Sequence, residues 1–230
     1  MAEQKARELS PEESELLLRI EQDPSALDDV VEDLSARNRR KRQLAACVLG
    51  LVAQRDAGLL TGCIPEMIDA LELSEAQTRW EILDALTLLV PEHAKELGSA
   101  YEGAADALFD EVSATLRLSA FRFLSAWGAT ERGRSKKVWP VIDEAIQCFH
   151  GDLEYRDMLV CLHEFAGGKI EGGVAGELAG RLRFDAESGK GVFIKGRSAE
   201  IYEMLVARFK LDKPQKRARA VAKSESEDDE

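Results

Sequence analysis

The sequence has few aromatic residues, few prolines and no long apolar run. Aromatic residues account for 6% of the 230 positions, and there are six prolines. The longest apolar run, residues 44–53, has about half of the ~20 residues that a transmembrane helix requires, so we expect no membrane span. Hydrophobic residues make up 45% and charged residues 32% of the chain. That balance excludes a disordered chain and is typical of a helical protein with a sizeable core.

Cysteine is also scarce, and no two cysteines have the C-x-x-C spacing. The four thiols lie in mostly apolar helical patterns, and we expect them to be free and buried in a reducing compartment: Cys47, Cys63, Cys148 and Cys161. The first ten residues, MAEQKARELS, are charged and contain no apolar segment of the kind found in secretory signals. The sequence therefore predicts a cytoplasmic protein.

The net charge of −12 is concentrated at the two ends of the sequence. Residues 1–34 carry eleven acidic and three basic residues, and residues 224–230 carry five acids and no base. Between them, residues 35–223 hold 27 acids and 28 bases. A nearly neutral body neither excludes nor favours an anionic partner such as nucleic acid.

An internal repeat is the strongest pattern in the sequence. An arginine begins each of five apolar helical patterns, at intervals of 37, 38, 39 and 41 residues: Arg42, Arg79, Arg117, Arg156 and Arg197. After Arg79, for example, Leu83, Leu86 and Val90 recur at helical spacing. Four positions before each of the first four arginines stands a residue that could cap the helix: Asn38, Glu75, Ser113 or Asp152.

A series of aspartates repeats with nearly the same period in the intervening segments. Asp33, Asp69, Asp106 and Asp143 are separated by 36, 37 and 37 residues. Residues 64–71 (IPEMIDAL) and 138–146 (VWPVIDEAI) look like copies of one segment, and their prolines are two periods apart. Two interleaved series with one period predict stacked helical hairpins, because a single hairpin cannot bury its own apolar face.

Together the two helices of this unit resemble a HEAT repeat. The first helix has the form I-P-x-hydrophobic-I-D, and the second begins with a polar cap followed by an arginine. The resemblance covers residues 24–209 and implies an all-α, right-handed α-α superhelix of the HEAT or armadillo-like kind, with about five helical hairpins. The last unit departs from the pattern, because Gly189-Lys190-Gly191 and Phe193-Ile194 interrupt the approach to Arg197. This unit is either a divergent cap or contains an irregular connection.

The two ends of the sequence differ from the repeats. Ser10-Pro11-Glu12-Glu13 is a capping box with proline at the first helical position, and it predicts an N-terminal capping helix. The stretch from residue 213 onward has no apolar period and changes from basic to acidic. We therefore predict a flexible N-terminus over residues 1–9, a solenoid over 10–209, and a disordered charged tail over 210–230.

The repeated arginines and aspartates are predicted to be structural. A position that recurs in every unit first indicates a requirement of stacking, and the arginine of the HEAT repeats that this sequence resembles is usually of that kind. We expect the following residues to form a ladder that links neighbouring units: Arg42, Arg79, Arg117, Arg156, Arg197, Asp69, Asp106 and Asp143. The alternative is that the arginines line a concave surface and bind phosphate or an acidic partner.

Three clusters of cations are better candidates for a binding surface. They are Arg39, Arg40 and Lys41; Arg132, Arg134, Lys136 and Lys137; and Lys190 and Lys195, close to Arg197. If the clusters lie on one side of the solenoid, they would form a shallow basic track. The alternative is that each cluster is only a solvated turn.

Motifs for metal binding and catalysis are weak. Cys148-Phe149-His150 and Cys161-Leu162-His163 suggest zinc, but residues two apart on a helix do not share a face. Cys161 also lies about nine residues past the expected turn, or ~13 Å along a helix. His163-Glu164 lacks the second histidine of H-E-x-x-H. We predict no metal site and no cofactor.

The sequence thus predicts a non-catalytic scaffold that binds a protein or peptide partner through one face of a solenoid. The alternative is a nucleic-acid-binding protein similar to the alkylpurine DNA glycosylases, whose HEAT-like solenoid holds DNA against a carboxylate and aromatic residues. The residue types are present at Trp80, Trp127 and Trp139, and at Asp84, Asp110 and Asp143, but no motif of that family matches position by position. Trp80 and Trp127 lie on apolar stripes, where packing in the core is the simpler explanation.

Overall fold

The structure of the protein is a computed structural model that describes residues 8–211. Every regular element in this range is a helix. In chain order, the α-helices are α1 (Pro11–Gln22), α2 (Ala26–Glu32), α3 (Arg39–Asp56), α4 (Ile64–Asp69), α5 (Ala76–His93), α6 (Tyr101–Leu108), α7 (Ala114–Gly128), α8 (Arg132–Phe149), α9 (Tyr155–Gly167), α10 (Gly172–Ser188) and α11 (Val192–Phe209). Four 3-10 helices lie between them: η1 (Asp33–Ser35), η2 (Ala57–Cys63), η3 (Ala70–Glu72) and η4 (Glu96–Ala100).

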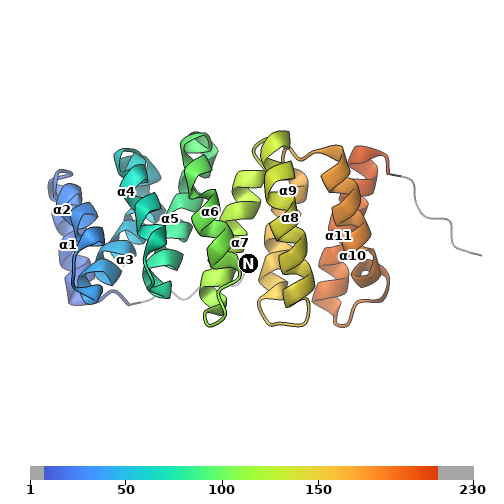
Figure 1. The fold of residues 1–230 in the computed structure, drawn as a ribbon, viewed down its shortest axis with the longest axis horizontal. Helices are drawn as coiled ribbons and strands as arrows, with labels where there is room; N and C mark the ends of the chain where they lie inside the picture. The colour runs from blue at the N-terminus through green and yellow to red at the C-terminus, as the bar shows by residue number, and fades with distance from the viewer. Residues whose placement is uncertain (1–7, 212–230) are drawn as a thin grey trace, which may run out of the picture.

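The helices form a row of antiparallel hairpins along the long axis of the molecule (Figure 1). Five hairpins follow one another: α2 with α3, α4 with α5, α6 with α7, α8 with α9, and α10 with α11. Helix α1 packs on α2 and α3 at the N-terminal end of the row. The predicted all-α solenoid of about five hairpins with an N-terminal capping helix is therefore confirmed.

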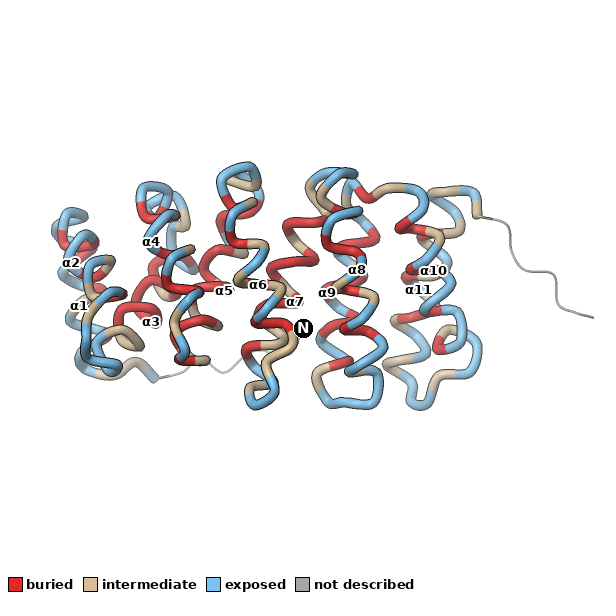
Figure 2. Tube along the Cα trace, viewed as in Figure 1, coloured by how far each residue is buried: buried red, intermediate tan, exposed pale blue. Residues whose placement is uncertain are grey.

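The hairpins stack in two layers. The second helices, α3, α5, α7, α9 and α11, pack successively against one another, and the first helices form the other layer, which we call the first-helix layer. Buried residues lie where the layers face each other, and exposed residues cover the outer surfaces and loops (Figure 2). The core is one continuous cluster from Leu17 to Leu205, as expected when each unit buries its apolar face against its neighbours. Burial of each large apolar side chain contributes about 1.5–3 kcal/mol.

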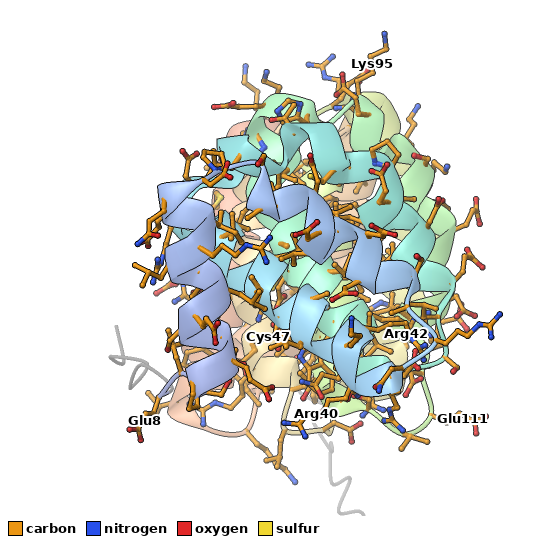
Figure 3. All side chains as sticks on the ribbon, turned by 90° about the vertical axis from the view of Figure 1, so that its left-hand side faces the viewer. Glu8, Arg40, Arg42, Cys47, Lys95 and Glu111 are labelled. Atoms are coloured by element: carbon orange, nitrogen blue, oxygen red, sulfur yellow. The ribbon has the colours of Figure 1, made fainter. Side chains whose placement is uncertain are left out.

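Antiparallel hairpins give the solenoid two different edges. Loops that join the two helices of one unit, such as 36–38 and 109–113, lie at what we call the within-unit edge. Segments that join successive units, such as η2 and the loop 129–131, lie at the opposite, between-unit edge. Figure 3 shows this separation, with Arg40, Arg42 and Glu111 at one edge and Lys95 at the other.

The second helices begin near the predicted caps, with one exception. The side chain of Asn38 accepts hydrogen bonds from the first turn of α3, and that of Ser113 accepts one from the first turn of α7. Glu75 stands at the start of α5, but its side chain makes no capping bond. Asp152 is not a cap. Its carbonyl accepts a hydrogen bond from Tyr155 in an extra turn, which moves the N-cap of α9 to Glu154.

The last unit contains the irregular connection that its sequence indicates. Gly191 has φ of 90°, a conformation that residues with a Cβ atom rarely adopt, and it precedes the first residue of α11. Phe193 and Ile194 lie in the first turn of α11 rather than in a loop. Residues 1–7 of the predicted N-terminal segment and 212–230 of the predicted tail lie outside the described residues.

Candidate functional site

Two of the repeated arginines bind the acidic residue at the start of the second helix in the next unit. Nη2 of Arg117 lies 2.5 Å from Oε1 of Glu154, and its Nε lies 3.1 Å from the same oxygen. Arg42 makes the corresponding ion pair with Glu75. All four side chains are at most 15% exposed. These pairs hold neighbouring units together and leave little of either arginine open to a ligand.

The other arginines of the series have different partners. For Arg79 and Arg156, the residue at the start of the second helix in the next unit is not acidic but Ser113 or Gly191. Arg79 donates to Oδ2 of Asp106 at 2.8 Å and to the carbonyl of Gly103 at 3.3 Å. The guanidinium of Arg156 lies 4.7 Å from the ring centroid of Phe193, a cation–π contact with the last unit. Arg197, in that last unit, pairs with Glu200 of its own helix at 2.9 Å.

The repeated aspartates of the first-helix layer also form ion pairs with lysine or arginine, with the exception of Asp69. Asp143 accepts two hydrogen bonds from Arg181 of the next unit, at 2.7 and 2.8 Å, and these bonds raise the pKa of Arg181. Asp33 pairs with Lys41 at 3.1 Å. Asp69 is exposed, and it forms no ion pair with any other residue in the range 8–211. It lies between two grooves of the first-helix layer.

The three basic clusters do not share one side of the solenoid. Arg39, Arg40 and Lys41 begin α3, a second helix, whereas Arg132 begins α8, a first helix. Because the hairpins are antiparallel, these two starts lie at opposite edges. Lys190 and Lys195 lie at the within-unit edge, but in the last unit of the row. The condition for a basic track across all three clusters, that they lie on one side of the solenoid, is therefore not met.

Several of these cations are also bound within the protein. Arg40 pairs with Glu12 at 3.3 Å. The ammonium of Lys137 lies 3.9 Å from the ring centroid of Tyr101, and Arg134 lies 5.6 Å from that of Trp127. The remaining cations of the clusters are exposed: Arg39, Arg132, Lys136, Lys190 and Lys195.

The cysteines and histidines do not form a metal site within residues 8–211. Three of the thiols are buried as predicted, but Cys148 is exposed, because it lies on the solvent side of the last turn of α8. Nε2 of His150 instead lies 2.8 Å from Oδ2 of Asp185, and the hydroxyl of Tyr155 donates to the same oxygen at 3.0 Å. That buried carboxylate links the last two units.

The tryptophans and carboxylates that a glycosylase-like site would use are buried in the core or bound to other residues of the solenoid. Trp127 is 4% exposed, and its indole N–H donates to the carbonyl of Ala94 at 2.7 Å. Trp139 is also buried, and Trp80 is half-buried against the core. The three carboxylates are occupied: Asp84 pairs with Arg122, Asp110 accepts from the backbone N–H groups of Val112 and Ser113, and Asp143 pairs with Arg181.

The first-helix layer contains a groove that the sequence did not reveal. This first groove, of about 450 Å³, lies between α2–η1 and the segment η2–α4–η3. Its apolar lining includes Val31, Leu34, Cys63, Ala70 and Leu73. Its acidic lining is Asp28, Glu32, Glu66 and Asp69, and all four carboxylate residues are exposed.

Among residues 8–211, no lysine, arginine or histidine lines the first groove. The field of its carboxylates reaches the thiol of Cys63, whose pKa is raised by burial first and then by the charges of Glu66 and Asp28. A thiol that is held neutral and 8% exposed adds to the apolar part of the surface.

A second groove adjoins the first on the other side of α4. It has a volume of about 510 Å³ and shares Gly62 and Asp69 with the first groove. Its apolar lining is formed by Ile64, Pro65 and Ile68, and its polar lining includes Glu96 and His93. Together the two grooves give the first three units a surface that combines partly exposed aliphatic groups, such as Val31, Ile68 and Leu73, with carboxylates.

The stacked hairpins define the protein as an armadillo/HEAT-like α-solenoid. An engineered protein has the same arrangement, with a TM-score of 0.66 at 12% identity over 86% of this chain and 85% of that one. Computationally designed armadillo repeat proteins for modular peptide recognition give a TM-score of 0.65 at 12% identity, over 82% of this chain and 85% of that one. A second engineered protein gives 0.58 at 15% identity, over 79% and 98%. No family model and no curated protein matches the sequence.

One helical stretch has the length and composition of a membrane span. It is Arg39–Glu72, which comprises α3, η2, α4 and η3, and its most apolar window is 50% buried inside the solenoid. A helix in the core of a solenoid can have the same length and composition. Helix α3 is in such a position, because it packs between α1 and α5.

Proposed function

We propose that the protein is a non-catalytic scaffold that binds an extended segment of a partner protein in the two grooves of the first-helix layer. The observation that carries this proposal is the pair of adjoining grooves, which share Gly62 and Asp69 and combine apolar and acidic linings. Such a combination is typical of sites that bury an apolar side chain while polar groups fix its orientation.

The state of the other polar groups supports this location. The repeated arginines are largely buried or paired, and arginines of the solenoid occupy the carboxylates of Glu75, Glu154, Asp84 and Asp143. The four carboxylates of the first groove, in contrast, form no ion pair within residues 8–211 and are available to a partner. Designed armadillo repeat proteins for modular peptide recognition have a similar fold, which supports the proposal of a peptide-like partner.

The proposal is tested by selecting binders to the full-length protein from a library of random peptides. A variant that blocks the grooves then shows whether the selected peptides bind there. Gly62 is suited to this purpose, because a Cβ atom built on it meets nothing within 4 Å. The change Gly62→Phe should place an aromatic ring between the two grooves and reduce the binding of selected peptides at least about tenfold.

Two controls make the result specific. Gly62→Ala adds no bulk beyond the Cβ and should bind as the parent does. Gly151→Phe places the same exposed ring in the loop 150–154, where a Cβ also meets nothing within 4 Å, and should leave binding unchanged. Equal binding by the parent and by Gly62→Phe would place the selected peptides elsewhere and overturn the proposal.

A further inference from the structure

We infer that the segment bound in the first groove inserts a lysine or arginine side chain between the carboxylates of α2 and α4. The inference rests on the proposed function and adds the chemistry of the partner: an extended peptide that carries one cation next to apolar residues. Four features of the groove carry it.

The first feature is the unbalanced charge of the lining. Asp28 and Glu32 lie one turn apart on α2, and Glu66 and Asp69 lie on α4 across the groove. All four are exposed, and none forms an ion pair within residues 8–211. Carboxylates on opposite sides of one groove repel one another, and a cation placed between them removes this repulsion.

The second feature is the contrast with equivalent positions in other units. Asp33, Asp106 and Asp143 each bind a lysine or arginine from within the solenoid, at 3.1, 2.8 and 2.7 Å. Asp69 belongs to the same series but has no cationic partner in the part of the chain that the structure describes. The position that stacking leaves unpaired is thus the position that lines the groove.

The third feature is the apolar part of the lining. Val31, Leu34 and Leu73 provide an aliphatic surface beside the carboxylates. Lysine and arginine lay their aliphatic stems along such surfaces while the charged end reaches a polar rim. A simple metal cation would not use this surface, and no three acidic, histidine or cysteine side chains among residues 8–211 converge to hold a metal ion.

The fourth feature is the continuity with the second groove. A chain that crosses Gly62, where there is no side chain, passes directly from the first groove to the aliphatic lining formed by Ile64 and Ile68. The partner segment is therefore expected to carry an apolar residue within a few positions of the cation.

Three pools of synthetic pentapeptides test the inference with the full-length protein. Every pool has mixed residues at four positions, and the central residue is arginine, its neutral isostere citrulline, or glutamate. Binding is measured by fluorescence anisotropy at low and at moderate salt. The arginine pool should bind at least about tenfold more tightly than the citrulline pool, the glutamate pool should bind least, and added salt should reduce the difference.

Matched variants assign the effect to the groove. Asp28→Asn combined with Asp69→Asn should abolish the preference for arginine over citrulline. The control is Asp29→Asn combined with Glu72→Gln, which removes two exposed carboxylates of the same segments that do not line the groove and should preserve the preference. The control removes the same number of negative charges as the test variant. It leaves the groove unchanged, because Asp29 instead binds Arg19 at the exposed surface.

The outcomes separate the inference from the proposed function. If the arginine and citrulline pools bind equally and Gly62→Phe blocks both, the groove binds peptides without needing a cation, and only the inference fails. If no pool binds any form of the protein, the proposed function fails as well. The sequence itself contains a basic stretch, with cations at Lys213, Lys216, Arg217, Arg219 and Lys223. If the arginine pool binds only after these five are changed to glutamine, the occupant is the protein's own segment, which overturns the inference of an external partner.

Discussion

Arg117 of α7 and Glu154 at the start of α9 form an ion pair that joins two successive units, with Nη2 and Oε1 2.5 Å apart. The side chains are 14% and 11% exposed, and the N–H of Nη1 of Arg117 also binds the carbonyl of Asp110 in its own unit. One guanidinium thus spans the interface between two hairpins. The same relationship recurs between Arg42 and Glu75, two units earlier.

The change Glu154→Gln should destabilise the protein by about 3 kcal/mol, because it leaves the guanidinium of Arg117 buried without its counter-charge. The free energy of unfolding is measured by urea denaturation. Asp29→Asn is the control, since it breaks an ion pair whose side chains are 58% and 65% exposed and should cost less than about 1 kcal/mol. Equal losses for the two variants would show that the Arg117 pair does not hold the units together.

The contribution of Glu154 should also depend on pH. Burial alone would raise the pKa of this carboxyl, but the hydrogen bonds and charge of Arg117 and a backbone hydrogen bond outweigh it and lower the pKa below 4.5. A group with a lowered pKa in the folded state contributes its stability above its unfolded pKa, and the contribution is lost as the pH falls through the folded value. The difference in unfolding free energy between the parent and Glu154→Gln should therefore be constant near neutral pH and shrink below about pH 4.5. A difference that stays constant down to about pH 2 would contradict this assignment.

Gly128 tests the packing between units. A Cβ atom at this position would lie 2.4 Å from Cγ2 of Val138 and 3.1 Å from Cε2 of Phe165, so Gly128→Ala forces neighbouring side chains to move. We expect a loss of about 1–3 kcal/mol. Gly180→Ala is the matched control in the middle of α10, where nothing lies within 4 Å, and should stabilise the protein by up to about 1 kcal/mol. Thermal unfolding of both variants gives the comparison, and a stabilising Gly128→Ala would refute the packing of α7 against α8 and α9.

The cysteines should react in a defined order. Cys148 is exposed, whereas burial raises the pKa of Cys161 to about 11 and also raises that of Cys63. At about pH 8, N-ethylmaleimide should modify Cys148 first and leave the buried thiols largely unmodified in the folded protein. Mass spectrometry of peptides from a time course measures the order, and all four thiols should react in urea. Faster modification of Cys161 than of Cys148 would be incompatible with this structure.

The fold could be predicted from the sequence because its determinants are local and repeated. Each unit shows its helical period directly, and the spacing of Arg42, Arg79 and Arg117 sets the number of hairpins. Side-chain partners in neighbouring units could not be predicted in the same way, because they lie far apart in the sequence, as do Arg79 and Asp106 (27 positions) or Arg117 and Glu154 (37 positions). Nothing in the sequence distinguishes Asp69, which has no cationic partner among the described residues, from Asp106, which binds Arg79.

The errors have similar physical causes. Asp152 was expected to cap a helix, but an extra turn moves the start of α9 to Tyr155. The sequence left open whether the basic clusters share a side, because the placement of each cluster depends on whether it follows a within-unit or a between-unit loop. The grooves beside α4 could not be inferred at all, because they arise from the distance between neighbouring first helices.

Hydrogen–deuterium exchange of the full-length protein, with and without a selected arginine-containing peptide, tests the central claim most directly. The account predicts slower exchange on binding in residues 28–35 and 62–73, which line the first groove, and no change in residues 39–42 or 132–137. Protection of those basic segments, with the groove unchanged, would contradict it.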